Sequence, residues 1–296
     1  MRKELSILIP TYNTDCTQLV NDLHAQAIMQ DSLAFEIIVA DDGSTEDICV
    51  ECLAKLESIS HVRLLSHREN VGRAAIRNVL AREAQYQHLL FIDSDMKISD
   101  NDFLSRYLKA EGEVIYGGYS IASMPLLQNR NLRYMYEVEA APRQIPEKRA
   151  LHPHRDFHTS NFLVERDIIL RHPFDERFRF YGYEDVFWGK QMKSNNIPIR
   201  HIDNPVVFHE FEENAHFMEK TEEGLRTLHQ FSEELKGYSS LLDFTKRHTF
   251  LCTVVRQWHR LLGEAERRNL IGSNPSTLLF KLYKLGYFIS LDKTAR

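Results

Sequence analysis

Short apolar runs alternate with helical patterns through the first hundred residues, and this alternation constrains the fold more than any other feature. The apolar runs predict strands at residues 5–10, 35–40, 62–65 and 88–93. Amphipathic spacing predicts helices between them, at residues 18–30, 45–58 and 72–84. Strands that alternate with helices build right-handed βαβ units around a parallel sheet. The predicted fold class is therefore α/β.

The pattern changes after another predicted strand at residues 114–119. Residues 120–156 contain few periodic apolar positions and many Arg, Pro and His residues, so we expect an irregular segment, which in a compact domain usually serves function or moves. Beyond it the sequence predicts three strands and one helix, in the order 159–164, helix 184–194, 198–202 and 205–209. The remaining residues predict helices. We expect a catalytic domain at 1–215 and a helical C-terminal region at 216–296.

Composition narrows the functional classes. The chain has 296 residues, 43% of them apolar, and a net charge of −5, which argues against a nucleic-acid-binding protein. The sequence shows no signal peptide and no apolar segment long enough to span a bilayer, so we expect a cytoplasmic location. Cys49 and Cys52 form a C-x-x-C within a predicted helix, and no second pair follows. We interpret them as ordinary helix residues rather than a zinc or redox site.

The C-terminal region is strongly asymmetric in charge. Glu210 to Lys236 holds eight acidic and three basic residues, whereas Phe244 to Arg296 holds ten Lys or Arg against three Asp or Glu. The basic part is also rich in aromatic residues and leucine. One interpretation is a helical tail that lies on the anionic inner face of a membrane. The alternative is a set of helices that pack on the catalytic domain and expose a solvated basic face.

Two carboxylates follow the apolar run His88–Ile92. Asp93 and Asp95 are one residue apart, at the carboxyl end of a predicted strand, where open α/β sheets bind ligands. Such hard oxygen ligands suit Mg²⁺ or Mn²⁺ carrying a phosphorylated substrate. Taken alone, an Asp-Ser-Asp turn explains the same residues, because both residue types favour turns.

Further motifs fall at the same predicted edge of the sheet. They are Pro10-Thr11-Tyr12-Asn13, Asp41-Asp42-Gly43-Ser44, Asn70-Val71-Gly72-Arg73 with Arg77-Asn78, Tyr183-Glu184-Asp185, and His209. Their order and spacing resemble the family 2 glycosyltransferases of GT-A fold, over roughly residues 4–210. The stretch from Asn161 to Asp185 also resembles the acceptor half of galactosyl- and N-acetylgalactosaminyltransferases.

The resemblance implies a GT-A fold, with a Rossmann-like mixed sheet, and a UDP-sugar donor carrying Gal, GalNAc, Glc or GlcNAc. Thr11 and Tyr12 would cradle the base, Asp42 or Asp41 would contact uracil or ribose, and Asp93 would contact ribose or sugar. The alternative role for Asp41 and Asp42 is to cap the following helix. The alternative for Arg73 and Arg77 is a place on a solvated helix face. The full nucleotide-sugar set would be Pro10, Thr11, Tyr12, Asn13, Asp41, Asp42, Asn70, Arg73, Arg77, Asp93 and Ser94.

The resemblance also assigns chemistry. Asp95 and His209 would bind Mn²⁺ or Mg²⁺, and Asp185 would act as the general base of an inverting transfer. Glu184, Tyr183 and Asn161 would bind the acceptor, a glycan or a lipid-linked saccharide. Capping of the helix at 184–194 is the alternative for Glu184 and Asp185. The histidines His152, His154 and His158 are interpreted as an acceptor-side loop.

Two other functions fit parts of the pattern. A nucleotidyltransferase also uses strand-end aspartates and a metal, but it should carry a glycine-rich phosphate loop after the first strand, and residues 10–14 contain no glycine. A non-catalytic protein that binds a nucleotide sugar or glycan could lose the base or the metal ligand, yet Asp95 and Asp185 are both present. The sequence therefore favours an enzyme.

Overall fold

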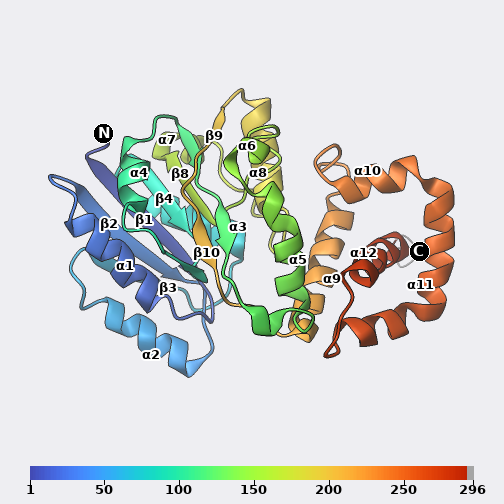
Figure 1. The fold of residues 1–296 in the computed structure, drawn as a ribbon. Coiled ribbons are helices and arrows are strands. Elements are labelled where there is room, and N and C mark those ends of the chain that lie inside the picture. Colours follow the sequence, from blue (N-terminus) through green and yellow to red (C-terminus); the bar gives the residue numbers. More distant parts are fainter. Residues whose placement is uncertain (292–296) are drawn as a thin grey trace. The chain divides into compact units, whose positions relative to one another are not determined.

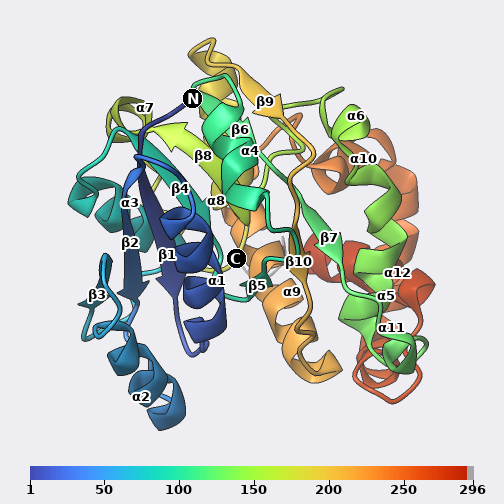
Figure 2. The same cartoon turned by 60° about the vertical axis from the view of Figure 1, so that its left-hand side comes forward.

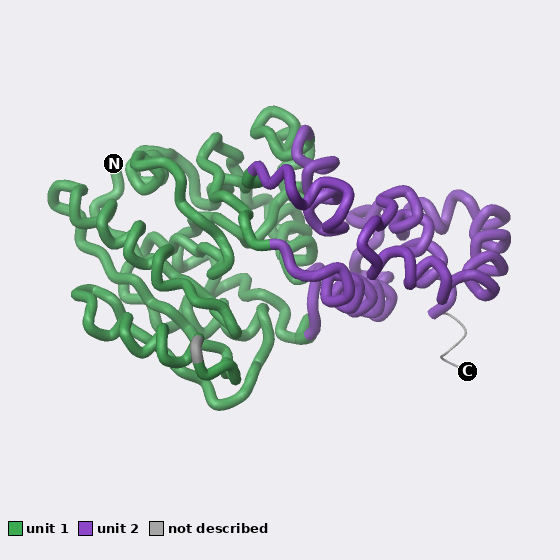
Figure 3. The backbone as a smooth tube through the Cα atoms, turned by 60° about the horizontal axis from the view of Figure 1, so that its bottom comes forward, with its two compact units in different colours: residues 1–122, 143–179, 184–210 green, residues 123–142, 180–183, 211–296 purple. Residues whose placement is uncertain are grey.

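The computed structural model describes residues 1–291 and divides into two compact units (Figure 3). Unit 1 comprises residues 1–122, 143–179 and 184–210. Unit 2 comprises residues 123–142, 180–183 and 211–296, so it takes two segments from within the first two thirds of the chain. The predicted domain boundary at 215/216 stays a prediction.

Unit 1 is built around a seven-stranded sheet with helices along the chain between its strands (Figure 1). Its strands are β1 (Glu4–Thr11), β2 (Ala34–Asp41), β3 (Val62–Ser66), β4 (His88–Ile92), β6 (Val114–Tyr116), β8 (Asn161–Glu165) and β9 (Ile199–His201). Its helices are α1 (Thr17–Ile28), α2 (Asp47–Leu56), α3 (Arg73–Glu83), α4 (Phe103–Lys109), α6 (Pro146–Arg149), α7 (Arg166–Arg171) and α8 (Glu184–Ser194).

The strand order is β3-β2-β1-β4-β8-β6-β9. The neighbours β3, β2, β1 and β4 pair in parallel, as the alternation of strands and helices predicted. Strand β8 runs antiparallel to both β4 and β6, so it is the one reversed strand of a mixed sheet. Because the other strands run the same way, the carboxyl ends of β1, β2 and β4 lie at one edge.

A predicted single strand at residues 114–119 is wrong. The chain forms β6, turns at Gly117 and Gly118, and continues as β7 (Tyr119–Ile121) in a second sheet of order β5-β10-β7. A Cβ on Gly117 would lie 2.4 Å from the carbonyl oxygen of Asn204, so only glycine fits this close approach. The other strands of this sheet are β5 (Met96–Lys97) and β10 (Val206–Phe208).

Aromatic side chains fill the core beside β4 and β8. Phe91 stacks on Phe162 with ring centroids 4.9 Å apart, and Trp188 of α8 stacks on Phe174 at 5.3 Å. The Trp188 indole N–H donates to the carbonyl oxygen of His172, so burial leaves this donor paired. Full burial of each such ring contributes roughly 1.5–3 kcal/mol, which fixes α8 and its N-terminal carboxylates on the sheet.

The expectation of irregular structure at residues 120–156 is also wrong. This segment contains two 3₁₀ turns and two helices, η1 (Pro125–Leu127), α5 (Leu132–Ala140), η2 (Ala141–Arg143) and α6 (Pro146–Arg149). Pro125 and Pro146 lie at the first positions of η1 and α6, where a missing N–H costs nothing. The Asn131 side chain accepts from the N–H of Tyr134 and caps α5.

Unit 2 is helical (Figure 2). With α5 it contains α9 (Asn214–Gln230), α10 (Ser240–Arg247), α11 (Thr249–Leu270) and α12 (Thr277–Ser290). Leu132, Phe217, Phe280 and Tyr283 belong to its buried core. The predicted helical C-terminal region is confirmed. Among residues 1–291, no helix is both long and apolar enough to cross a bilayer.

Candidate active site

The loop after β1 presents one exposed aromatic ring beside buried polar groups. Thr11 is buried, and its hydroxyl donates to the carbonyl oxygen of Thr14, whereas Tyr12 is exposed. The Asn13 side-chain oxygen accepts from the N–H groups of Thr45 and Glu46, at 2.8 and 3.2 Å. Asn13 therefore orders the residues just before α2. Tyr12 is the exposed aromatic ring of this loop, in a position to stack on a base.

The two aspartates after β2 organise two different turns. Asp41 Oδ1 accepts from both the backbone N–H and the hydroxyl of Ser44. Asp42 accepts from the N–H groups of Val71 and Gly72, at 2.8 and 3.0 Å, and so orders the loop that enters α3. Burial raises the pKa of Asp42, and these two N–H groups oppose the rise.

Glycines allow this loop to pack closely. Gly72 has φ 95°, and a Cβ there would lie 2.7 Å from the carbonyl oxygen of Arg179. A Cβ on Gly43 would lie 2.9 Å from the backbone nitrogen of Asn70, which places Asn70 against the turn at Asp41 and Asp42. The motifs at 41–44 and 70–73, remote in the sequence, are therefore adjacent.

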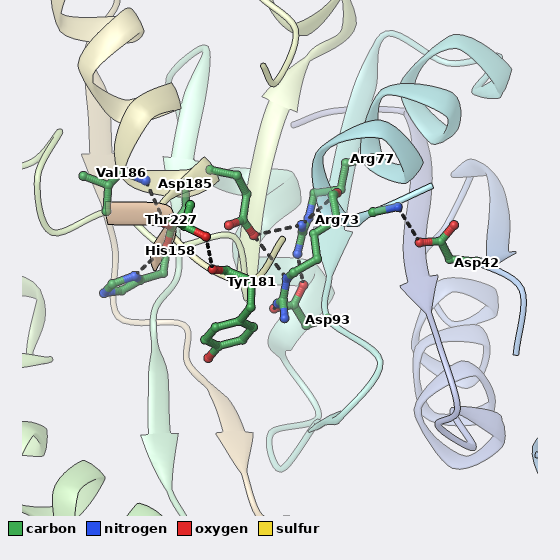
Figure 4. Close-up of polar contacts among 11 residues, drawn as sticks. Asp42, Arg73, Arg77, Asp93, His158, Tyr181, Asp185, Val186 and Thr227 are labelled. Atoms are coloured by element: carbon green, nitrogen blue, oxygen red, sulfur yellow. Dashed lines mark hydrogen bonds and ion pairs between the residues drawn. The ribbon is translucent and has the colours of Figure 1, made fainter. Parts of the chain in front are cut away.

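Two arginines of α3 face two carboxylates (Figure 4). Arg77 Nη2 lies 2.5 Å from Asp93 Oδ1, and Arg77 Nη1 lies 3.5 Å from Glu184 Oε1. Arg73 contacts the same carboxylates, at 3.5 Å to Asp93 and 3.1 Å to Glu184. Burial raises the pKa of Glu184, and the charges of Arg73 and Arg77 oppose the rise. The cluster balances two positive against two negative charges.

Asp95 immediately precedes β5 and His209 immediately follows β10, two strands that pair with each other. Strand β10 pairs antiparallel with β5, with Phe208 opposite Met96, so the next residues along this ladder are His209 and Asp95. His209 Nδ1 is buried with no hydrogen-bond partner among the described residues, and Nε2 lies 3.6 Å from Glu210 Oε1. A carboxylate beside an imidazole is a donor set that Mn²⁺ accepts. The residues fit the predicted metal.

No group of three or more His, Cys, Asp or Glu side chains is arranged to hold a metal ion in the described part of the chain, residues 1–291.

Ser94 lies between Asp93 and Asp95 in the turn after β4, and the N–H of Asp93 donates to the carbonyl oxygen of Ser160 on the approach to β8. The turn is thus fixed to the neighbouring strand.

Asp185 is held through both of its carboxylate oxygens. Oδ1 accepts from the N–H of Val186 at 2.7 Å, and Oδ2 lies 3.0 Å from His158 Nδ1 (Figure 4). Burial by itself raises the pKa of Asp185, but the hydrogen bond and charge of His158 and the N–H of Val186 lower it to a net value below its ordinary range. Asp185 is therefore ionised at neutral pH.

His158 is the residue of the candidate site that the sequence pattern did not link to Asp185. It lies 27 residues before Asp185, in a predicted acceptor loop, and no spacing rule links the two. Tyr116 and Tyr119 surround its ring, with centroids 6.2 and 6.1 Å away. The neighbouring His154 donates to the backbone instead, since its Nε2 lies 2.9 Å from the carbonyl oxygen of Ile197. Only a carbonyl acceptor is present there, so His154 Nε2 is the donor.

The predicted acceptor residues fall in three environments. Asn161 is completely buried: its amide donates to the carbonyl oxygens of Gly118 and Asn204, and its oxygen accepts from Tyr107. These bonds give Asn161 a structural role at the β6–β7 turn. Glu184 is buried against the arginines. Tyr183 belongs to unit 2 and has φ 72°, an unusual conformation that clusters at functional sites.

Solved structures with the same fold include sugar transferases. A mannosyltransferase from Pyrobaculum calidifontis aligns with 99% of this chain and 88% of its own, with TM-score 0.59 and 14% identity. Residues 1–349 of TarS from S. aureus align with 99% of this chain and 91% of their own, with TM-score 0.53 and 15% identity. Identity this low shows the fold alone. The fold is GT-A, as the sequence predicted.

The family follows from the sequence. The model of Glycosyl transferase family 2 matches residues 6–172, more than half of the chain, and the chain therefore belongs to that family. Fold and family together define a glycosyltransferase, which favours the predicted enzyme over the nucleotidyltransferase alternative.

Named relatives share about a quarter of their residues with this chain over the aligned regions. Chondroitin synthase of Pasteurella multocida is 23% identical over 239 residues, covering 70% of this chain and 24% of the relative. An Escherichia coli enzyme named UDP-Glc:alpha-D-GlcNAc-diphosphoundecaprenol beta-1,3-glucosyltransferase WfgD is 27% identical over 197 residues, covering 65% of this chain and 71% of the relative. The chain thus spans about a quarter of the chondroitin synthase but most of WfgD.

Proposed function

We propose that the protein transfers a hexose from a UDP-sugar to a hydroxyl group of a glycan or lipid-linked saccharide, with inversion and with a divalent metal. The observation that carries the proposal is a set of three differently held carboxylates in unit 1. Asp93 lies against two arginines, Asp95 and His209 flank the paired strands β5 and β10, and Asp185 is held by His158. Binding sugar, metal and acceptor proton requires three such groups with distinct partners.

The donor's uridine lies against the loops after β1 and β2 in this proposal. Tyr12 stacks on the uracil, and the turn at Asp41 and Asp42 supplies the polar contacts to base or ribose. Because Arg77 is buried and already paired, it holds Asp93 in place for the ribose or sugar. Arg73, which is 43% exposed, is the arginine that can reach a ligand.

Asp95 and His209 hold Mn²⁺ or Mg²⁺ in this proposal. When bound, the metal neutralises charge on the diphosphate of the donor and on the UDP leaving group. The mannosyltransferase with the same fold was solved with GDP-Man and Mn²⁺, which supports a divalent ion. In this proposal the two ligands come from the residues next to the paired strands β5 and β10.

Asp185 takes the proton of the acceptor hydroxyl. As it does so, the acceptor oxygen bonds to the anomeric carbon, the bond from that carbon to the diphosphate oxygen breaks, and UDP leaves with the electron pair. Attack opposite the leaving group inverts the anomeric configuration. The lowered pKa of Asp185 supports this role because the carboxylate is available at neutral pH.

The printed name of WfgD specifies a diphosphoundecaprenol-linked sugar, and the alignment covers most of the length of that relative. This similarity favours a lipid-linked acceptor. That relative uses UDP-Glc, which makes UDP-Glc the first donor to test. Glu184 and Tyr183 are the proposed acceptor contacts. Asn161 acts on the acceptor site only indirectly, through the turn it holds.

The first experiment measures thermal stabilisation by UDP-Glc, UDP-GlcNAc, UDP-Gal and UDP-GalNAc with and without Mn²⁺. A ligand at a hundred times its Kd stabilises by about 2.7 kcal/mol, so a true donor produces a clear shift. Asp95→Asn should remove the Mn²⁺-dependent part of the shift. Asp102→Asn, at an exposed aspartate whose side chain forms no cap, should leave it unchanged. A Mn²⁺-dependent shift that survives Asp95→Asn would remove the metal assignment.

The second experiment tests the base. Asp185→Asn should reduce transfer, measured as UDP release in the presence of acceptor, by roughly a hundred- to ten-thousand-fold, because general-base assistance is lost. The same variant should bind the UDP-sugar as tightly as the unmodified protein. Full activity in Asp185→Asn would contradict the mechanism, and donor binding without any transfer in the unmodified protein would indicate a binding protein.

A further inference from the structure

Unit 2 contains an exposed apolar stripe on helix α11, formed by Phe250, Val254, Trp258, Leu261 and Leu262. These side chains are 83, 51, 48, 81 and 38% exposed, respectively. Spacings of four, four and three residues place the first four on one side of the helix. A contiguous apolar patch on a solvent-exposed surface indicates an interaction site.

The opposite side of α11 is the packed one. Cys252, Val255, Glu266 and Leu270 are buried, and α12 lies along this side within unit 2 (Figure 1). The Trp258 indole N–H donates to Glu266 Oε1, so the polar edge of the ring is satisfied by the helix itself. The exposed remainder of that ring is apolar. Packing therefore leaves the stripe uncovered within the part of the chain that the structure describes.

Cations flank the stripe. Lys246 and Arg247 are exposed at the end of α10, immediately before α11, and Arg260 and Arg268 are exposed on α11. From Lys246 to Arg268 the chain has six Lys or Arg against two Glu. The excess acid of unit 2 lies on α9 and its flanks instead, from Glu212 to Lys236. Along the chain, unit 2 thus has an acidic part around α9 and a basic part around α11, and the apolar stripe belongs to the basic part.

We infer that α11 is a membrane-docking helix that lies in the plane of an anionic lipid surface. A helix with Phe, Trp and Leu on one face and Arg beside them buries the apolar face at the headgroup boundary, while the cations meet anionic lipids. Charge complementarity selects this occupant over a second copy docked stripe to stripe, because that symmetric contact would bring like charges together. The inference is independent of the proposed reaction.

Flotation with lipid vesicles tests the inference on the full chain. The protein should float with phosphatidylcholine vesicles that contain about 30% phosphatidylglycerol and not with pure phosphatidylcholine. Binding should weaken as salt rises from about 0.05 M to about 0.5 M, because salt screens the attraction. Failure to float with anionic vesicles at low salt would overturn the inference.

Matched variants assign the binding to the stripe. The double variant Phe250→Ser and Leu261→Ser removes its two most exposed side chains and should reduce the floated fraction about five-fold or more. Leu126→Ser, at an equally exposed leucine (87%) outside α11, should float like the unmodified protein. Circular dichroism and donor-induced thermal shifts should be unchanged in both variants, which separates loss of docking from misfolding or loss of the donor site.

Two results would overturn the assignment. One is undiminished flotation of the double variant. The other is a dimer in solution, measured by light scattering, that the double variant converts to monomer without any change in flotation, because the stripe would then bind a second copy.

Discussion

Asp185 and His158 form a pair in which each side chain restricts the other. The carboxylate accepts at both oxygens, which fixes its orientation at the start of α8, and the Nδ1 atom of His158 supplies one of these bonds. Burial raises the pKa of Asp185, but the hydrogen bond and charge of His158, the N–H of Val186 and the charge of Arg73 together hold it below its ordinary range. His158 is thus a positioning residue for the proposed base.

Variants of His158 should move the pH profile of transfer. His158→Ala removes the hydrogen bond and the charge, so the pKa of Asp185 should rise and the acidic limb of kcat/KM should shift to higher pH. His158→Asn places an amide N–H near the position of Nδ1 and should restore part of kcat, with an intermediate shift. An unchanged pH profile in His158→Ala, whatever its activity, would show that His158 acts only in folding.

Residue types and order could predict Asp185 but not its partner. An acidic pair before a helical pattern is visible in the sequence, whereas a hydrogen bond across 27 residues depends on how β8 and α8 pack. The same limit applies to Asn161, a polar residue of β8 whose amide is entirely used by the β6–β7 turn.

At the level of elements, Arg77 links three parts of unit 1. It projects from α3 to Asp93 after β4 and to Glu184 at the start of α8, and its side chain is only 2% exposed. Arg73, one turn earlier, contacts the same two carboxylates but is 43% exposed. The two arginines thus contact the same carboxylates but differ in burial. They form a matched pair for measuring how burial affects the strength of these ion pairs.

Arg77→Met should destabilise the protein by about 3–5 kcal/mol, because it leaves buried carboxylates with less compensation. Arg73→Met should cost about 0–1 kcal/mol, as expected for a solvent-screened pair. Urea denaturation without ligand measures both. Equal losses of stability in the two variants would show that burial does not set the strength of these ion pairs.

At the level of the whole molecule, a half-buried histidine makes the stability depend on pH. His201 ends β9, its Nε2 donates to the carbonyl oxygen of Pro153, and its Nδ1 is buried without a hydrogen-bond partner among the described residues. Burial lowers the pKa of His201 to about 4, and the positive charge of Arg149 adds to this, against the opposing hydrogen bond to Pro153. The folded protein therefore favours neutral His201.

Because the folded pKa of His201 lies below its unfolded value of 6.5, the unfolded chain binds the proton first as pH falls. Stability should be fully present above about pH 6.5 and decrease towards pH 4, by at most about 3 kcal/mol from this group. His201→Gln, which keeps a donor for Pro153, should flatten this decrease in urea denaturation. His216→Gln, at an exposed histidine of α9, should retain the original slope, and equal slopes in all three proteins would contradict the assignment.

The fold was predictable where local pattern and tertiary structure agree. Strands β1 to β4 and helices α1 to α3 follow the predicted boundaries within a few residues, since each alternates clearly and packs on its sequence neighbours. The prediction failed at residues 114–156. There Gly117 and Gly118 divide one apolar run between two sheets. Pro125 and Pro146 begin η1 and α6, but in the sequence alone a proline looks like a residue that ends a helix.

The sequence by itself determined the α/β class, the family and the carboxylates at the strand ends, because strand period, motif order and residue chemistry are local properties. Only the tertiary structure decided which partners hold those carboxylates and which face of α11 is uncovered. Arg77 with Asp93, His158 with Asp185, and the ladder that brings His209 to Asp95 join segments 16 to more than 100 residues apart. Such pairings arise from strand order and helix packing, which no short window of sequence contains.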